Sequence, residues 1–121
     1  MTTSEIATVL AWHDALNARD FDTLDRLCSD DIEFGDARGA AQGRAALRQW
    51  AQELGETVTA GQMFVHDGVV VVEQTIADSD GETDTSASAF RVVRDHVTSV
   101  FHHRDLAAAL AATDLTESDL V

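Results

Sequence analysis

The sequence contains no tyrosine and no proline, it has a single cysteine, and none of its eight basic residues is lysine. One cysteine excludes an internal disulfide and any metal cluster built on several cysteines. The 22 acidic residues give a formal net charge of −14. Because so acidic a surface repels nucleic acids and anionic membranes, we expect neither as a partner.

Long apolar runs are also missing. No stretch approaches the roughly 20 apolar residues that a membrane-spanning helix needs. The first residues carry no basic region followed by an apolar segment, so we expect no secretory signal. We therefore expect the protein to be cytoplasmic. The 121 residues show no repeat and no linker. We therefore expect one domain, residues 1–121, with a single core.

Apolar residues recur at helical spacing in the first half of the chain. One face of the first such segment carries Ile6, Val9, Leu10, His13 and Leu16, with Trp12 on its flank. The predicted elements are a helix over Ser4–Ala18, a short helix beginning at Asp22, a strand over Ile32–Asp36, a loop over Ala37–Gly43 and a helix over Arg44–Leu54.

From Thr57 onward the hydrophobic period changes to two, which is typical of strands. The predicted strands are Thr57–His66, Val69–Asp78, Thr83–Arg94 and Val97–Arg104, with turns at Asp67-Gly68, Ser79-Asp80-Gly81 and Arg94-Asp95-His96. A short helix over Asp105–Ala112 and an acidic tail that frays follow. Helices first and antiparallel strands afterwards favour an α+β fold. We expect a curved, antiparallel-rich sheet wrapped around the N-terminal helices, forming a cone whose open end is a cavity if its inward side chains are small.

Four stretches of the chain resemble the nuclear transport factor 2-like superfamily, including its SnoaL-like and ketosteroid isomerase-like branches. They are Trp12–Leu24, Asp30–Asp36, Gly43–Leu47 and Val97–Asp105. The resemblance covers nearly the whole chain and implies a cystatin-like α+β barrel. The superfamily contains isomerases, cyclases, dehydratases, epoxide hydrolases and non-enzymatic binding modules, so function has to be argued from the site.

Against the ketosteroid isomerases, Asp36 falls on the aspartate that moves a proton on carbon. The oxyanion tyrosine of that family falls on Trp12, and the protonated acid falls near Ser88. An indole N–H and a serine hydroxyl both donate hydrogen bonds, but neither is as acidic as the group it replaces. This chemistry uses no cofactor, so the resemblance predicts none.

Asp36 is also the best candidate on physical grounds. A carboxylate at the end of a strand, facing an apolar cavity, has its pKa raised by desolvation and can act as a base near neutral pH. The alternative is a solvated aspartate that begins a loop or caps Gly39 and its neighbours.

Glu73 is the second candidate acid, since it interrupts an apolar strand. Alternation places it on one face with Val71 and Thr75, and places Gln74 on the other face. If the first face lines the cavity, Glu73 is a second acid there; the alternatives are a solvated position or a dimer contact with Arg91. Against the limonene epoxide hydrolases, Glu73, Thr75 and His102 occupy the equivalent positions, but the arginine between the acids is missing. Epoxide hydrolysis therefore ranks below proton transfer.

Of the adjacent His102 and His103, only one points inward, and the family register favours His102. An imidazole there can relay a proton or orient a bound carbonyl; the alternative is a partly exposed strand histidine. His13 is expected in the core with one nitrogen hydrogen-bonded. No two potential ligands have metal-binding spacing on one element, so we expect no metal site.

The leading hypothesis is a homodimer, formed through the outer sheet face, that binds one small apolar or polycyclic molecule. In a catalytic version Asp36 moves a proton next to a carbonyl, assisted by His102 or Glu73. The residues expected to contact the ligand are Trp12, Trp50, Met63, Thr75, Ser88, Phe90 and Val100. The alternatives are a non-catalytic binding or accessory module and, more weakly, a dimerisation domain without a cavity.

Overall fold

The computed structural model describes residues 2–36 and 38–121. Its helices are α1 (Thr2–Ala18), α2 (Phe21–Arg26), α3 (Arg44–Glu53) and α4 (Leu106–Thr113), with a short 3-10 turn η1 (Glu117–Asp119). Its strands are β1 (Cys28–Asp36), β2 (Gly39–Gln42), β3 (Thr57–His66), β4 (Val69–Ala77), β5 (Thr83–Val93) and β6 (His96–His103). None of the helices in the described ranges combines the length and the apolar character that crossing a membrane requires.

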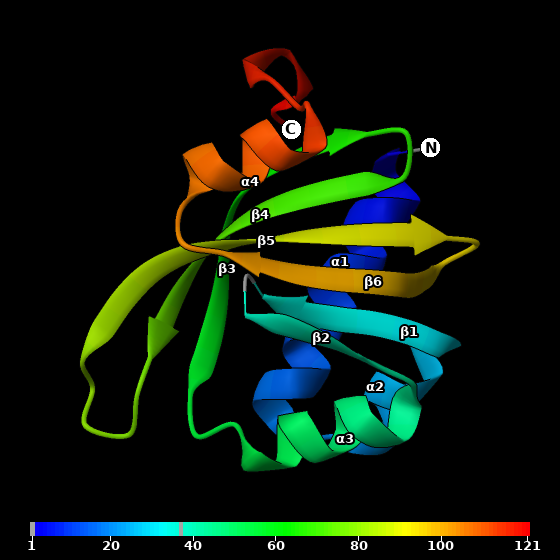
Figure 1. Ribbon diagram of the computed structural model, residues 1–121, viewed down its shortest axis with the longest axis vertical. Helices are drawn as coiled ribbons and strands as arrows, with labels where there is room; N and C mark the ends of the chain where they lie inside the picture. Colours follow the sequence, from blue (N-terminus) through cyan, green and yellow to red (C-terminus); the bar gives the residue numbers. More distant parts are fainter. Residues whose placement is uncertain (1, 37) are drawn as a thin grey trace.

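The six strands form one open sheet in the order β2-β1-β6-β5-β4-β3 (Figure 1). Neighbouring strands are antiparallel except for β1 and β6, which run parallel. The pairing of β1 with β6 brings the Asp36 end of β1 beside the last strand of the chain. The predicted α+β architecture, with a curved sheet around N-terminal helices, is confirmed.

The sheet has two differently covered faces. The inner face packs against α1, α2 and α3 and carries most of the buried apolar side chains, whereas the outer face is covered by α4 over only part of its area (Figure 1). Alternation along β4 decides which side chain goes where. Val70 and Val72 lie in the inner core, and Val71 lies in the smaller outer core beneath α4.

Two hairpin turns set the register of the antiparallel strands. Asp67 and Gly68 have φ values of 48° and 80°, and Arg94 and Asp95 have values of 51° and 65°. Positive φ at both central residues gives a two-residue turn the twist that matches its flanking strands. The predicted turns at both places are confirmed.

The predicted loop over Ala37–Gly43 is wrong for residues 39–42, which form the edge strand β2; Ala37 lies outside the described residues. β2 pairs with β1 through Gly35, opposite Ala40. A Cβ atom at Gly35 would lie 2.2 Å from the Gly39 carbonyl oxygen. Only glycine therefore allows the two strands to approach this closely.

The C-terminal tail packs against the sheet instead of fraying as predicted. Thr116 and Asp119 form a capping box around η1. Beyond it, Leu120 bridges to Phe64, and the Val121 N–H donates to the Met63 carbonyl oxygen at 3.0 Å. These backbone contacts cover part of the edge strand β3, which would otherwise expose unpaired groups.

Candidate functional site

Aromatic rings from α1, α3, β1 and β5 pack against one another along the inner face. The ring centroids of Trp12 and Phe90 are 5.0 Å apart in an edge-to-face arrangement, and both side chains are buried. Trp50 from α3 stacks 6.3 Å from Trp12 and lies 6.0 Å from Phe34 of β1. Because Trp50 and Phe34 are only half-buried, these two rings form the accessible end of the cluster.

A chain of hydrogen bonds crosses the inner face from α1 to β6. His13 Nδ1 lies 2.8 Å from the Val9 carbonyl oxygen, and His13 Nε2 lies 2.9 Å from Gln74 Nε2. The Ser88 hydroxyl donates to Gln74 Oε1 at 2.7 Å and lies 2.6 Å from His102 Nδ1. We call His13, Gln74, Ser88 and His102 the polar relay.

The sheet register assembles the polar relay. Gln74 follows Val70 and Val72 at two-residue spacing, so its side chain points to the inner face. Ser88 of β5 is paired with Val72 on one side and with His102 on the other. His13, Gln74 and Ser88 are buried and His102 is half-buried, so the relay runs from the core to the half-buried end where Trp50 and Phe34 lie, which we call the open end of the inner face.

His102 combines burial with a nearby charge. Its ring lies 5.9 Å from that of Trp50. Burial lowers the pKa of His102 below its ordinary value of 6.5, the negative charge of Asp36 opposes this effect, and His103 and His13 reinforce it. The imidazole is therefore mainly neutral near physiological pH.

Asp36 does not have the predicted electrostatic environment. The Arg38 backbone N–H donates to its Oδ1 at 2.8 Å, and Arg38 Nη2 donates to its Oδ2 at 3.2 Å. These bonds, the backbone one first, hold the pKa of Asp36 below its ordinary value. The expected rise of that pKa is wrong because donors and water reach a carboxylate that is 37% exposed. The structure matches the alternative of an aspartate that begins a loop.

Glu73 and Thr75 lie on the outer face of β4, so the structure does not bring them together with His102. Glu73 pairs with Ala87 in the sheet register, and Ala87 belongs to the core beneath α4. The condition set for Glu73, that its face of the strand lines the inside of the cone, is not met, because Gln74 and not Glu73 points inward. The arrangement of acids expected from the limonene epoxide hydrolases is not assembled.

The remaining predicted ligand contacts differ in their access. Met63, Phe90 and Val100 are buried in the inner core, and Trp50 is half-buried at its open end. The Trp12 indole N–H is buried and has no hydrogen bond of ordinary geometry within the described residues. It interacts weakly with the Cys28 thiol. Burial raises the pKa of that thiol to about 12. Trp12 therefore does not present its N–H to the open end.

Gln74 is the residue of the relay that the sequence did not single out. Its signal was present, since it is the one amide in an apolar strand, but alternation alone does not say which of two faces is inward. His13 was expected in the core with a hydrogen-bonded nitrogen, and this prediction is confirmed. No group of three potential metal ligands gathers within residues 2–36 and 38–121.

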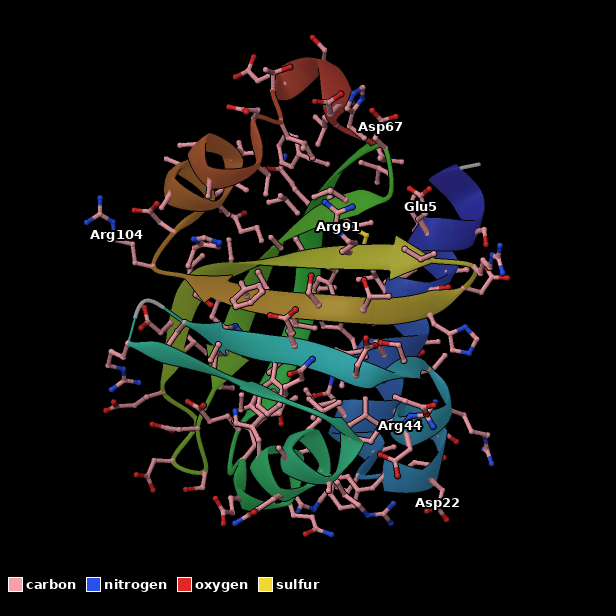
Figure 2. The ribbon with its side chains drawn as sticks, turned by 45° about the vertical axis from the view of Figure 1, so that its right-hand side comes forward. Glu5, Asp22, Arg44, Asp67, Arg91 and Arg104 are labelled. Carbon is pink, nitrogen blue, oxygen red and sulfur yellow. The ribbon has the colours of Figure 1, made fainter. Side chains whose placement is uncertain are left out.

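A groove with a volume of about 380 Å³ lies on the outer face beside α4. Its apolar floor and wall include Val69, Ala89, Phe101 and Ala112. Its polar groups come from Arg91, His103 and the predicted site residue Asp36. Figure 2 shows Arg91 on the side of the sheet that faces α4 and the C-terminal turn. We call this cavity the outer groove; it is a different place from the open end of the inner face.

Comparison with known proteins gives a family and a fold. The SnoaL-like domain family matches residues 9–111. No curated protein matches the sequence.

Three solved structures illustrate the fold. A candidate ketosteroid isomerase from Kribbella flavida has a TM-score of 0.76 at 19% identity, over 83% of this chain and 76% of its own. An LEH-like epoxide hydrolase from M. tuberculosis has a TM-score of 0.75 at 20% identity, over 93% and 96%. A candidate polyketide cyclase from Sinorhizobium meliloti has a TM-score of 0.70 at 18% identity, over 80% and 94%. At such identities the likeness shows the fold alone.

Proposed function

The chain belongs to the SnoaL-like domain family, and from this premise we propose that it binds a small, largely apolar molecule at the open end of its inner face, with His102 exchanging a proton with it. One observation supports the proposal: the half-buried His102 lies beside Trp50 and forms the β6 end of the otherwise buried polar relay. Functional sites combine a few oriented polar groups with apolar walls, and this arrangement has both features.

The chemistry that suits this site is proton transfer next to a carbonyl group. A neutral His102 can accept the proton of an acidic C–H bond, while the electron pair of that bond moves to the carbonyl oxygen. The imidazolium that forms is favoured by the negative charge of Asp36, which raises the pKa of His102. In the proposed reaction His102 is the base, and Asp36 acts through its charge instead of taking the proton itself.

The test is hydrogen–deuterium exchange of an enolisable bicyclic ketone, 2-tetralone, in D₂O buffer with the purified protein. The wild-type protein should accelerate exchange over buffer. His102→Gln should lower the protein-catalysed rate by about 10²–10⁴-fold, the usual contribution of a positioned base. His103→Gln is the matched control, because His103 pairs with Ala87 on the outer face. Exchange by the wild type no faster than in buffer would rule out the catalytic part.

A non-catalytic binding module is the second candidate, and the filled inner face favours it. The rings of Trp12 and Phe90 are buried in the inner core and leave little room between them. A binding module predicts that 2-tetralone perturbs Trp50 without any exchange above the buffer rate. We also propose that two copies associate through the uncovered part of the outer face, where Phe101 is half-buried.

A further inference from the structure

We infer that the polar relay has a fixed direction, which holds His102 as its Nδ1–H tautomer and makes the site selective for ligands that donate a hydrogen bond, such as planar phenols and enols. The inference deepens the proposed function and rests on it for the position of the ligand.

The direction is set at the α1 end of the relay. A carbonyl oxygen can only accept, so the hydrogen bond between the Val9 carbonyl and His13 requires a proton on His13 Nδ1. His13 is buried, and burial lowers its pKa, so the ring is neutral and carries only this proton. His13 Nε2 is consequently an acceptor, and the Gln74 amide NH₂ is its donor.

The next two links follow from the number of protons available. With its NH₂ facing His13, Gln74 presents its Oε1 to Ser88, and this oxygen can only accept. The single hydroxyl proton of Ser88 must therefore point to Gln74, 2.7 Å away. The Ser88 oxygen then faces His102 Nδ1 with a lone pair, at 2.6 Å, so His102 Nδ1 carries a proton. The opposite direction would leave two acceptors facing each other in the core.

The fixed tautomer has a consequence for the accessible nitrogen. Once a neutral His102 has its proton on Nδ1, its Nε2 carries a lone pair, and no described residue hydrogen-bonds to that atom. A ligand O–H can donate to it, and an acidic C–H can give up its proton to it. A carbonyl oxygen placed there would set one lone pair against another. His102 thus recognises a donor and does not orient a carbonyl oxygen.

The aromatic rings around His102 also select ligands by their shape. Trp50 lies 5.9 Å from His102 and 6.0 Å from Phe34, so a ligand bonded to Nε2 lies among aromatic rings. Flat molecules make the largest contact with such surfaces. The ligand class that fits is therefore a planar aromatic or conjugated compound with a hydroxyl group. His13, Gln74 and Ser88 act on it only through His102 and are positioning residues.

The tautomer can be measured on the unmodified protein by ¹⁵N NMR of its histidine rings near neutral pH. We expect a protonated Nδ1 and an unprotonated Nε2 in His102. Ser88→Ala, which removes the acceptor for Nδ1–H, should release the ring from this tautomer. Ser86→Ala is the matched control, because Ser86 is half-buried two residues away on the same strand and outside the relay. An Nε2–H tautomer in the wild type would overturn the inference.

The ligand class is tested with 2-naphthol and 2-methoxynaphthalene, which share the flat ring system but differ in the hydroxyl proton. We expect 2-naphthol to bind roughly two- to tenfold more tightly, as one net hydrogen bond would give, with chemical-shift changes at the Trp50 indole N–H. Ser88→Ala should reduce this preference and Ser86→Ala should preserve it. Equal affinity of both compounds at Trp50 would overturn the donor preference alone. If neither compound perturbs Trp50, the proposed site fails and the donor preference fails with it, whereas the tautomer is still decided by the ¹⁵N spectrum.

Discussion

The two faces of the same sheet differ in what they offer a ligand. The inner face has aromatic rings in contact and a polar relay whose hydrogen bonds run from α1 to β6. The outer face has a groove of about 380 Å³ whose walls are mainly apolar. The outer groove and the polar relay therefore lie on opposite faces of the sheet. Because reactivity depends on oriented polar groups, the inner face is the better candidate for chemistry, although the groove of about 380 Å³ lies on the outer face.

The largest expected contrast is the loss of a ring from each face. Phe90→Ala should cost about 3–5 kcal/mol of the free energy of unfolding, because it opens a cavity among buried aromatic rings. Phe101→Ala, on the outer face, should cost about 1 kcal/mol, since its ring is only half-buried. Urea denaturation of both variants measures the difference. Similar losses would mean that the outer face carries as much of the core as the inner face.

The relay offers a second contrast, between adjacent residues of β4. Gln74→Leu leaves the buried His13 Nε2 without its partner and removes the acceptor of the Ser88 hydroxyl proton, and it should cost about 2–4 kcal/mol. Glu73→Leu changes the next residue on the opposite face and should alter the free energy of unfolding by less than about 0.5 kcal/mol. Urea denaturation again measures both. A reversed order would show that Glu73 and not Gln74 is the polar group on which this strand depends.

The outer face is tested by its association with a second copy. Phe101→Glu places a charge on the proposed interface and should raise the dissociation constant of the dimer at least tenfold, about 1.4 kcal/mol. Analytical ultracentrifugation measures this constant. Leu10→Glu is the control, since Leu10 is an exposed apolar residue of α1, away from the outer face. A wild-type protein that sediments as a monomer would end the proposal of a homodimer.

A smaller effect is expected from pH. The pKa values of His13 and His102 are lowered by burial, so the unfolded chain binds protons on these rings before the folded chain does. The free energy of unfolding should therefore fall as the pH drops below 6.5, the ordinary histidine value, towards the lowered folded values. Urea denaturation at a series of pH values from neutral to about 5 gives the slope. His102→Gln should reduce this slope, because it removes one of the two buried rings.

The smallest effect is expected at Asp36. Asp36→Asn should leave the free energy of unfolding nearly unchanged, because its contact with Arg38 is exposed and screened by solvent. It should lower the pKa of His102 further, since it removes a negative charge that raises this pKa. An NMR titration of His102 checks the direction. A loss of deuterium exchange as large as that of His102→Gln would restore the aspartate as the base.

The sequence predicted the framework of the fold well because its signals are local. Helical and two-residue periods located the long elements, and Asp67-Gly68 and Arg94-Asp95 located two hairpins whose positive φ values the structure confirms. β2 was missed because residues 39–42 pair with β1 through a close approach that depends on Gly35. Such a contact leaves no periodic pattern in the segment itself.

The candidate site was predictable only in part. The position of His102 followed from the family register, but alternation along β4 gave two faces without saying which one was inward, so Glu73 was favoured over Gln74. The direction of the Asp36 pKa depends on two hydrogen bonds from Arg38, a residue two positions away. Desolvation was expected to dominate there, but the local donors outweigh it.

The most direct measurement is an NMR titration of the wild-type protein with 2-naphthol, followed at groups on both faces. We predict shift changes at the Trp50 indole N–H and the His102 ring, with the backbone amides of Phe101 and Ala112 unaffected. Changes confined to Phe101 and Ala112 would place the ligand in the outer groove and contradict the assignment of the inner face as the functional site.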